Sequence, residues 1–89
     1  MDEFLITVLG FAAGFLTVIA SIPQLVQVVR TRHVADLSMP MMVLFGSSAV
    51  VWTFYGIFIV SWPVIIVNIL LFAEWTALIL LKLKYGAKH

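Results

Sequence analysis

The stretch that decides the fold is LSMPMMVLFGSSAVVWTFYGIFIVSWPVIIVNILLFA, residues 37–73, which contains no charged side chain. As one straight α-helix with a rise of about 1.5 Å per residue it would be about 55 Å long, whereas the hydrocarbon core of a bilayer is about 30 Å thick. The stretch therefore has to fold back on itself. The segment Ser61-Trp62-Pro63 is the best place for a turn, because proline suits the first position of a helix. We expect helices over residues 39–59 and 63–83.

A third uncharged run lies upstream, between Glu3 and Arg30. Spanning a bilayer takes roughly 20 apolar residues, so this run predicts a helix over residues 4–29. The sequence contains no internal repeat, linker or low-complexity stretch. We therefore interpret residues 1–89 as one three-helix domain.

The composition points to the same class of protein. Hydrophobic residues make up 64% of the chain and charged residues 10%, and the mean hydropathy is +1.20. Soluble domains carry about 25% charged residues, so a soluble fold is excluded. Disorder is excluded because the apolar and aromatic content is too high. The absence of cysteine excludes a thiolate metal site and a cysteine nucleophile, and a net charge of +1 is too small for nucleic-acid binding. The prediction is an all-α membrane protein surrounded by lipid.

The distribution of basic residues predicts the orientation of the chain. Basic residues are concentrated after the first helix and at the C-terminus, at Arg30, Arg32, His33, Lys82, Lys84 and Lys88. The opposite ends of the helices carry only Asp2 and Glu3. Because Lys and Arg are enriched on the cytoplasmic side, we expect an inner-membrane protein with its N-terminus outside and its C-terminus in the cytoplasm.

Pro23 lies inside the first predicted helix and is followed by Gln24. A proline removes one backbone donor and leaves the carbonyl of Ile19 without its usual partner, which predicts a kink. Either a static bend or a hinge would explain this residue. Gln24 lies near the cytoplasmic end, where water can reach it.

The second predicted helix carries a stripe of residues with spacings of 4, 3, 4 and 3, which places them on one face. The stripe consists of Met41, Phe45, Ser48, Trp52 and Tyr55. Such a stripe serves either packing or a binding site. Trp52 favours a site, because an indole in mid-span needs an acceptor for its N–H group.

The third predicted helix carries Asn68, whose amide lipid cannot satisfy. Asn68 either joins helices or faces a watery cavity. It lies at a depth similar to that of Trp52, and an indole and an amide together make a plausible polyol site. No nucleophile, base or metal cluster is present, so the sequence predicts neither an enzyme nor a cofactor.

Glu74 lies near the middle of the third predicted helix, about 120° around from Asn68. A carboxyl group at this depth is either protonated or bound to a partner such as a hydroxyl group of a neighbouring helix. Proton coupling through this group is one alternative that the sequence leaves open.

Three segments together resemble a known family. The run SIPQLVQVVRTR (21–32), followed by DLS (36–38), is similar to the PQ-loop motif. WTFYG (52–56) and PVIIVN (63–68) resemble the second and third helices of bacterial SemiSWEET sugar transporters. Pro-Gln by itself is a weak signal, whereas the other two motifs at these spacings make the resemblance strong. It covers nearly the whole chain.

The resemblance implies a parallel homodimer of three-helix bundles, each packed in the order first, third, second, around a central path for a mono- or disaccharide. It implies pocket roles for Trp52, Asn68 and Ser48, and gate roles for Tyr55 outside and for Phe45 and Met41 inside. It also identifies Pro23 and Gln24 as the PQ motif, with the proline as a hinge.

The chain departs from the family pattern at the outer turn. Ile59 and Ser61 stand where several relatives have Arg and Asp, so we expect the outer gate to close by packing or through Tyr55. Pro40 and Glu74 also depart from that pattern. Two alternative functions remain at this point: transport of an amino acid or another small solute, including proton-coupled transport through Glu74, and a membrane scaffold without transport.

Overall fold

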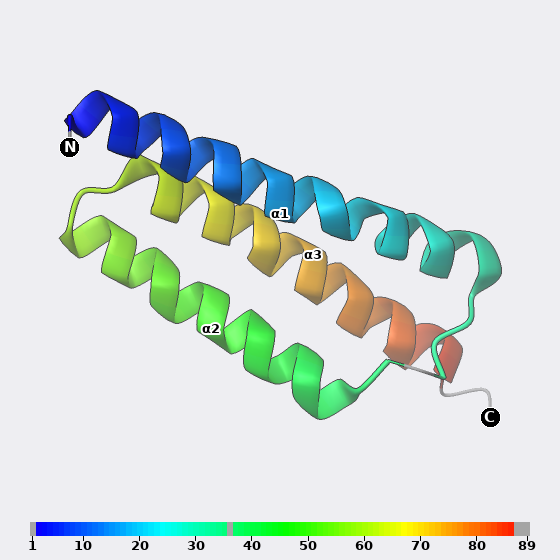
Figure 1. The fold of residues 1–89 in the computed structure, drawn as a ribbon. Coiled ribbons are helices and arrows are strands. Elements are labelled where there is room, and N and C mark those ends of the chain that lie inside the picture. The colour runs from blue at the N-terminus through cyan, green and yellow to red at the C-terminus, as the bar shows by residue number, and fades with distance from the viewer. Residues whose placement is uncertain (1, 36, 87–89) are drawn as a thin grey trace.

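The computed structural model describes residues 2–35 and 37–86, which form three helices. Helix α1 spans Glu3–Thr31, α2 spans Met39–Phe58 and α3 spans Trp62–Gly86 (Figure 1). All three are long and apolar enough to cross a membrane, and the described part of the chain contains no strand. The predicted three-helix fold is thus confirmed. The differences lie at the ends. Helices α1 and α3 each begin one residue earlier than expected and end two and three residues later, α2 ends one residue earlier, and Pro63 is the second residue of α3.

The helix ends are closed by local hydrogen bonds. The Phe4 amide donates to the Asp2 carboxylate at the start of α1 (3.1 Å), and the Met41 amide donates to the Ser38 hydroxyl at the start of α2 (3.3 Å). Side chains of this kind satisfy backbone donors that have no partner inside the helix. Pro40 lies in the first turn of α2, where a proline removes no needed hydrogen bond. This position accounts for its presence in the chain.

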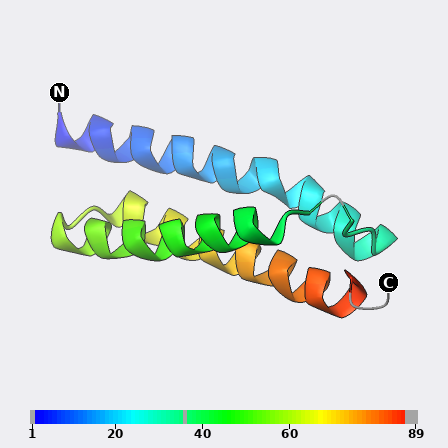
Figure 2. The ribbon, with the colours of Figure 1, turned by 90° about the horizontal axis from the view of Figure 1, so that it is seen from below.

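Helix α3 lies between the other two and packs against both, whereas no packing interface joins α1 to α2 within the described ranges. The predicted order α1, α3, α2 is therefore confirmed, and Figure 2 shows α1 standing apart from α2 along its N-terminal half. Two glycines allow α1 to approach α3 closely. A Cβ atom on Gly14 would lie 2.3 Å from a methyl group of Val67, and one on Gly10 would lie 3.0 Å from Pro63 Cβ. The sequence prediction did not use this Gly-x-x-x-Gly spacing, which is typical of close membrane-helix contacts.

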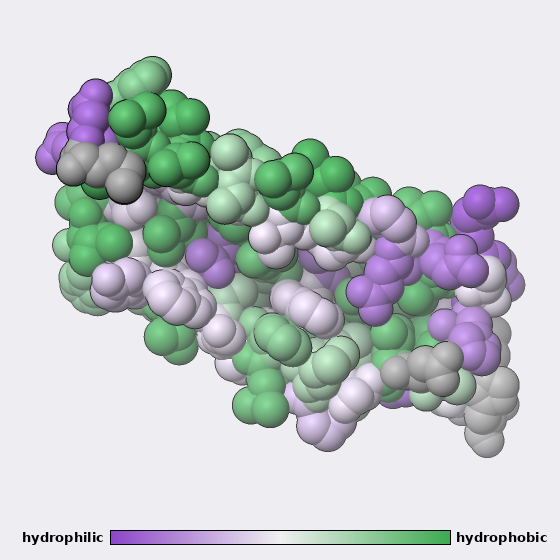
Figure 3. All heavy atoms as spheres, viewed as in Figure 1, coloured by the Kyte–Doolittle hydropathy of each residue, from purple (hydrophilic) through white to green (hydrophobic). Residues whose placement is uncertain are grey.

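The most deeply buried apolar cluster lies at one end of the bundle. It consists of Val28, Val34, Leu37, Met42 and Leu78. Lys82 holds the α1–α2 loop against α3 there, because its Nζ donates to the Val34 carbonyl oxygen (2.9 Å). Much of the remaining apolar surface is exposed in one chain, and Figure 3 shows hydrophilic residues gathered at the two ends. This pattern matches a molecule whose sides face lipid.

The start of α1 and the end of α3 lie at opposite ends of the bundle, as expected for three spans (Figure 1). The described basic residues of the loop and tail, including Arg32, Lys82 and Lys84, belong to the end with the buried cluster. Arg32 and Lys84 both lie over the Tyr85 ring, at 5.4 and 5.3 Å from its centroid. Lys88, which also entered the charge argument, and Asp36, which belongs to the PQ-loop-like segment, lie outside the described residues.

Candidate functional site

The stripe on α2 is an exposed face in a single chain. Trp52 and Tyr55 are each about half exposed, and their rings meet edge to face with centroids 5.4 Å apart. Toward the start of α2, Met41, Phe45 and Ser48 line a common cavity together with Leu44. The five stripe residues therefore form one continuous surface along α2, with an apolar end near the buried cluster and an indole and a phenol near the other end.

Asn68 lies at the same depth as Trp52 on the neighbouring helix. Trp52 lies six residues before the end of α2, and Asn68 lies six residues after the start of α3. The Asn68 amide is half-buried and donates to the Val64 carbonyl oxygen of its own helix (2.8 Å). Within one chain, Trp52 packs on Tyr55 of α2 and Asn68 bonds to Val64 of α3. Each group therefore has its contact on its own helix.

The Pro-Gln motif lies within α1, which continues as a helix through Pro23. Figure 2 shows the C-terminal part of α1 turned toward the other helices. Just before the proline, Thr17 and Ser21 donate hydrogen bonds to the carbonyl oxygens of Ala13 and Val18. Such bonds satisfy a hydroxyl group within its own helix and favour local bending. Pro23 itself is exposed, so no neighbouring element encloses it within one chain.

A cavity of about 200 Å³ joins this motif to the stripe on α2. Gln24 of α1 lines it on one side and Phe45 of α2 on the other. Between them, the ring of Trp75 on α3 stacks on Phe45 with centroids 5.0 Å apart and an angle of 9° between the planes. Trp75 is a candidate to which the sequence analysis assigned no role. Trp75 follows Asn68 by seven residues, or about two helical turns, so the two residues lie on the same face of α3. This spacing could have identified Trp75 from the sequence.

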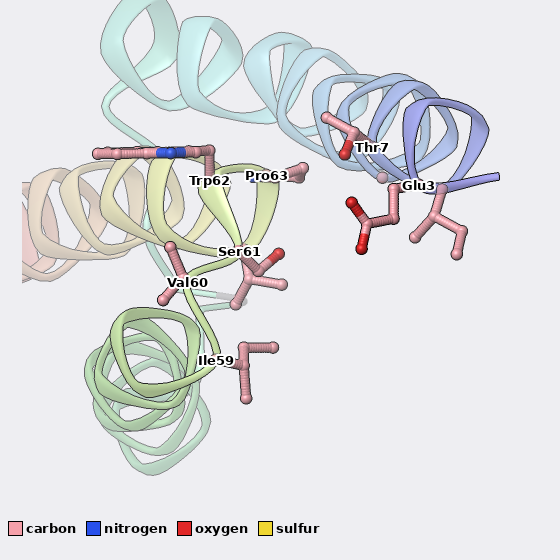
Figure 4. A pocket seen from close by; sticks show the side chains of 10 residues that line it. Glu3, Thr7, Ile59, Val60, Ser61, Trp62 and Pro63 are labelled. Carbon is pink, nitrogen blue, oxygen red and sulfur yellow. The ribbon is translucent and has the colours of Figure 1, made fainter.

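The end opposite the buried cluster holds a second pocket, between the start of α1 and the α2–α3 turn. Figure 4 shows Glu3 and Thr7 of α1 pointing toward Ser61 across it, with Ile59 below. No basic residue lines this pocket among the described residues, so an ion pair does not hold the turn. The turn is closed by backbone bonds, including one from the Ser61 amide to the Gly56 carbonyl oxygen (2.8 Å).

Glu74 has the hydroxyl partner that the sequence led us to expect. Its Oε2 is hydrogen-bonded to the Ser21 hydroxyl of α1, and its other oxygen is buried without a partner. The sequence did not identify Ser21 as that partner. The two residues are 53 positions apart, so only the packing of α1 on α3 brings them together.

The geometry suits binding more than chemistry. Half-exposed aromatic rings can stack on an apolar ring face, and an amide can both donate to and accept from hydroxyl groups. In the segments that the structure describes, no three His, Asp or Glu side chains gather as a metal site. A surface with these groups is fitted to hold a small polar molecule by contact.

Known proteins that are similar to this chain include membrane transporters. The family described as "PQ loop repeat" matches residues 5–65. A protein named "Sugar transporter SemiSWEET" from Bradyrhizobium diazoefficiens is 34% identical, covering 97% of this chain and all of that protein. A protein of the same name from Escherichia coli is 33% identical, covering 100% and 99%. The crystal structure of a bacterial homologue of SWEET transporters superposes with a TM-score of 0.88 at 32% identity, covering 92% of this chain and 99% of that one.

Proposed function

The chain belongs to the PQ-loop family and, within it, to the SemiSWEET group, and from this premise we propose that it transports a mono- or disaccharide across the membrane. The solute moves down its gradient, by alternating access, through a path between two parallel copies of the chain. Glucose and sucrose represent the expected size range. The names of the relatives in Bradyrhizobium diazoefficiens and Escherichia coli support a sugar as the solute.

The observation that carries this proposal is an aromatic ring on α2 and an amide on α3 that lie at matching depth, each with its printed contact on its own helix. The Trp52 ring is about half exposed, and Asn68 makes its hydrogen bond within its own helix. Within one chain neither group joins the helices together, which argues against a purely structural role. A second copy, related by a two-fold axis, supplies a second Trp52 and Asn68, so that a sugar is held between two rings and two amides.

The gates and the hinge follow from the same arrangement. Tyr55 closes the outer end of the path, and Phe45 with Met41 closes the inner end. Ser48 lies between these gates and lines the pocket. Pro23 is the hinge of α1, and Gln24 beside it faces the cavity that Phe45 also lines. The N-terminus lies outside the cell and the C-terminus in the cytoplasm of an inner-membrane protein.

The test is uptake into proteoliposomes that contain only this chain, measured across a panel of radiolabelled sugars and amino acids. Wild-type protein should take up a sugar and not an amino acid. Trp52→Ala and Asn68→Ala should each abolish that uptake, whereas Trp62→Ala, which removes an exposed tryptophan at the outer turn, should retain it. All three variants should elute with the wild type in size-exclusion chromatography.

Each contrary outcome has a definite meaning. Full uptake by both Trp52→Ala and Asn68→Ala would refute the assigned pocket. Uptake of an amino acid in place of a sugar would refute the solute class, and no uptake of any solute by the reconstituted wild type would favour a scaffold.

A further inference from the structure

Glu74 is an acidic residue midway along α3, twelve residues from either end of the helix. Its carboxyl group points to α1, on the side of α3 where Val67 meets Gly14. Phe45 of the proposed path lines the same cavity, but the proposed function gives Glu74 itself no role. Its contacts define a site of their own.

The first contact is with Ser21, whose Oγ has two hydrogen-bond partners. It lies 2.7 Å from the Val18 carbonyl oxygen, and it is also bonded to Glu74 Oε2. A hydroxyl group has one proton to donate, and a carbonyl oxygen can only accept. If Ser21 donates to Val18, the proton in the bond with Glu74 has to come from the carboxyl group.

The second oxygen of Glu74 leads to the same result. Oε1 is buried and has no hydrogen-bond partner. In an ionised carboxylate both oxygens share the negative charge, so half of that charge would lie against apolar groups without a donor. Leaving a neutral acceptor unpaired is far less unfavourable than leaving an ion unpaired.

The surroundings provide no charge to balance an ion. The cavity beside Glu74 is lined by the neutral polar groups of Thr17, Ser21 and Gln24 on α1, and by Phe45 on α2. From α3 itself it is lined by Leu71, Trp75 and Leu78. Among these described lining residues Glu74 is the one titratable group, so neither an ion pair nor a second acid shares its proton.

We propose that Glu74 and Ser21 form a proton-binding site between α1 and α3. In this site the proton lies on Glu74: its Oε2–H donates to Ser21 Oγ, and the Ser21 hydroxyl donates to the Val18 carbonyl oxygen. Ser21 lies two residues before Pro23, so a bend of α1 at the proline moves the acceptor of this proton. Occupancy of the site is thereby linked to the bend of α1.

The test is infrared spectroscopy of the chain in liposomes at neutral pH. The wild type should show the C=O stretch of a protonated carboxylic acid. The sequence contains two glutamates, Glu3 and Glu74. The band should shift when glutamate alone is labelled with ¹³C at its side-chain carboxyl, persist in Glu3→Gln and vanish in Glu74→Gln. In Ser21→Ala it should move to a higher frequency, because the acid loses its acceptor.

The proposal does not depend on the folding of one variant or on transport. The labelled wild type and the labelled Glu3→Gln protein report on Glu74 without changing it. Absence of the band in the wild type, its persistence in Glu74→Gln, or insensitivity to the glutamate label would overturn the proton site. An unchanged frequency in Ser21→Ala would overturn the role of Ser21.

Discussion

Asn68 and Lys82, both on α3, use their polar groups in opposite ways. The Asn68 amide donates within α3, whereas the Lys82 ammonium group crosses to the α1–α2 loop and donates to the Val34 carbonyl oxygen. Val34 is buried, and its carbonyl oxygen also accepts from the Leu37 amide (3.1 Å), so removing the lysine would take away the charged one of its two donors. Lys82 therefore stabilises the fold by joining two elements, whereas Asn68 joins none and is available for a ligand.

Lys82→Met tests the structural member of this pair. Methionine keeps the apolar stem of the side chain and removes the donor, so the free energy of unfolding should fall by about 1–3 kcal/mol. Lys84→Met is the control, because Lys84 is exposed and its contact with the Tyr85 ring is worth about 0.5–1 kcal/mol. Denaturation in mixed detergent micelles gives both values. Equal losses in the two variants would contradict the assigned role.

Helix α1 depends on small residues for its contact with α3. In lipid, apolar side chains gain little by leaving the solvent, so the closeness of packing decides whether helices associate. Gly10 and Gly14 allow that closeness, and the Ser21–Glu74 bond adds a polar contact further along the same helix.

Gly14→Ala should push α1 away from α3, because its Cβ atom would lie 2.3 Å from Val67 Cγ2. Overpacking of this kind destabilises by about 1–3 kcal/mol. Gly46→Ala is the matched control, since a Cβ atom there would lie 3.8 Å from Trp75 Cβ, and alanine favours a helix over glycine by about 1 kcal/mol. Thermal unfolding in detergent should therefore lower the Tm of Gly14→Ala alone. A Tm at or above the wild-type value in Gly14→Ala would show that this contact is loose.

The bend of α1 at Pro23 leads to a prediction about rate. Pro23→Ala restores the backbone donor to the Ile19 carbonyl group and should stabilise the helix by up to about 3 kcal/mol. If the bend is a hinge, uptake should slow several-fold although the protein is more stable. Pro40→Ala, in the first turn of α2, should change neither quantity greatly. A Pro23→Ala protein with wild-type uptake would identify a static bend.

The whole molecule is a narrow slab, 52 Å long with a cross-section of 22 by 14 Å. Three helices that pack in one row leave no room for an enclosed path, and the α2 stripe remains exposed. Two copies that face each other across this surface would enclose the path. The assembly of the two copies therefore belongs to the proposal for the function.

Crosslinking tests that assembly directly, because the chain contains no cysteine. Ser48→Cys, on the stripe, should form a dimer with a short bismaleimide in native membranes. Leu16→Cys on α1 is the control; it is exposed and should face lipid, so it should remain monomeric on a denaturing gel. Crosslinking of Leu16→Cys in place of Ser48→Cys would place the interface on α1.

The sequence by itself determined how many helices there are, where they turn and which ends carry the basic residues. Those properties depend on transfer from water to lipid, which is a sum over neighbouring residues and can be read along the chain. The spacing of Met41 to Tyr55 likewise predicted one shared face. The resemblance, rather than the spacing, led to the order of the helices.

Only the tertiary structure decided which groups meet across helices. The sequence indicated that Glu74 needs a partner, but only the packing of α1 on α3 shows that this partner is Ser21. In the same way, only the packing shows that Gly14 lies against Val67. Lipid and protein interior are equally apolar, so hydropathy does not distinguish a side of a helix that faces lipid from one that faces protein. That choice depends on close packing between distant segments, which no local pattern encodes.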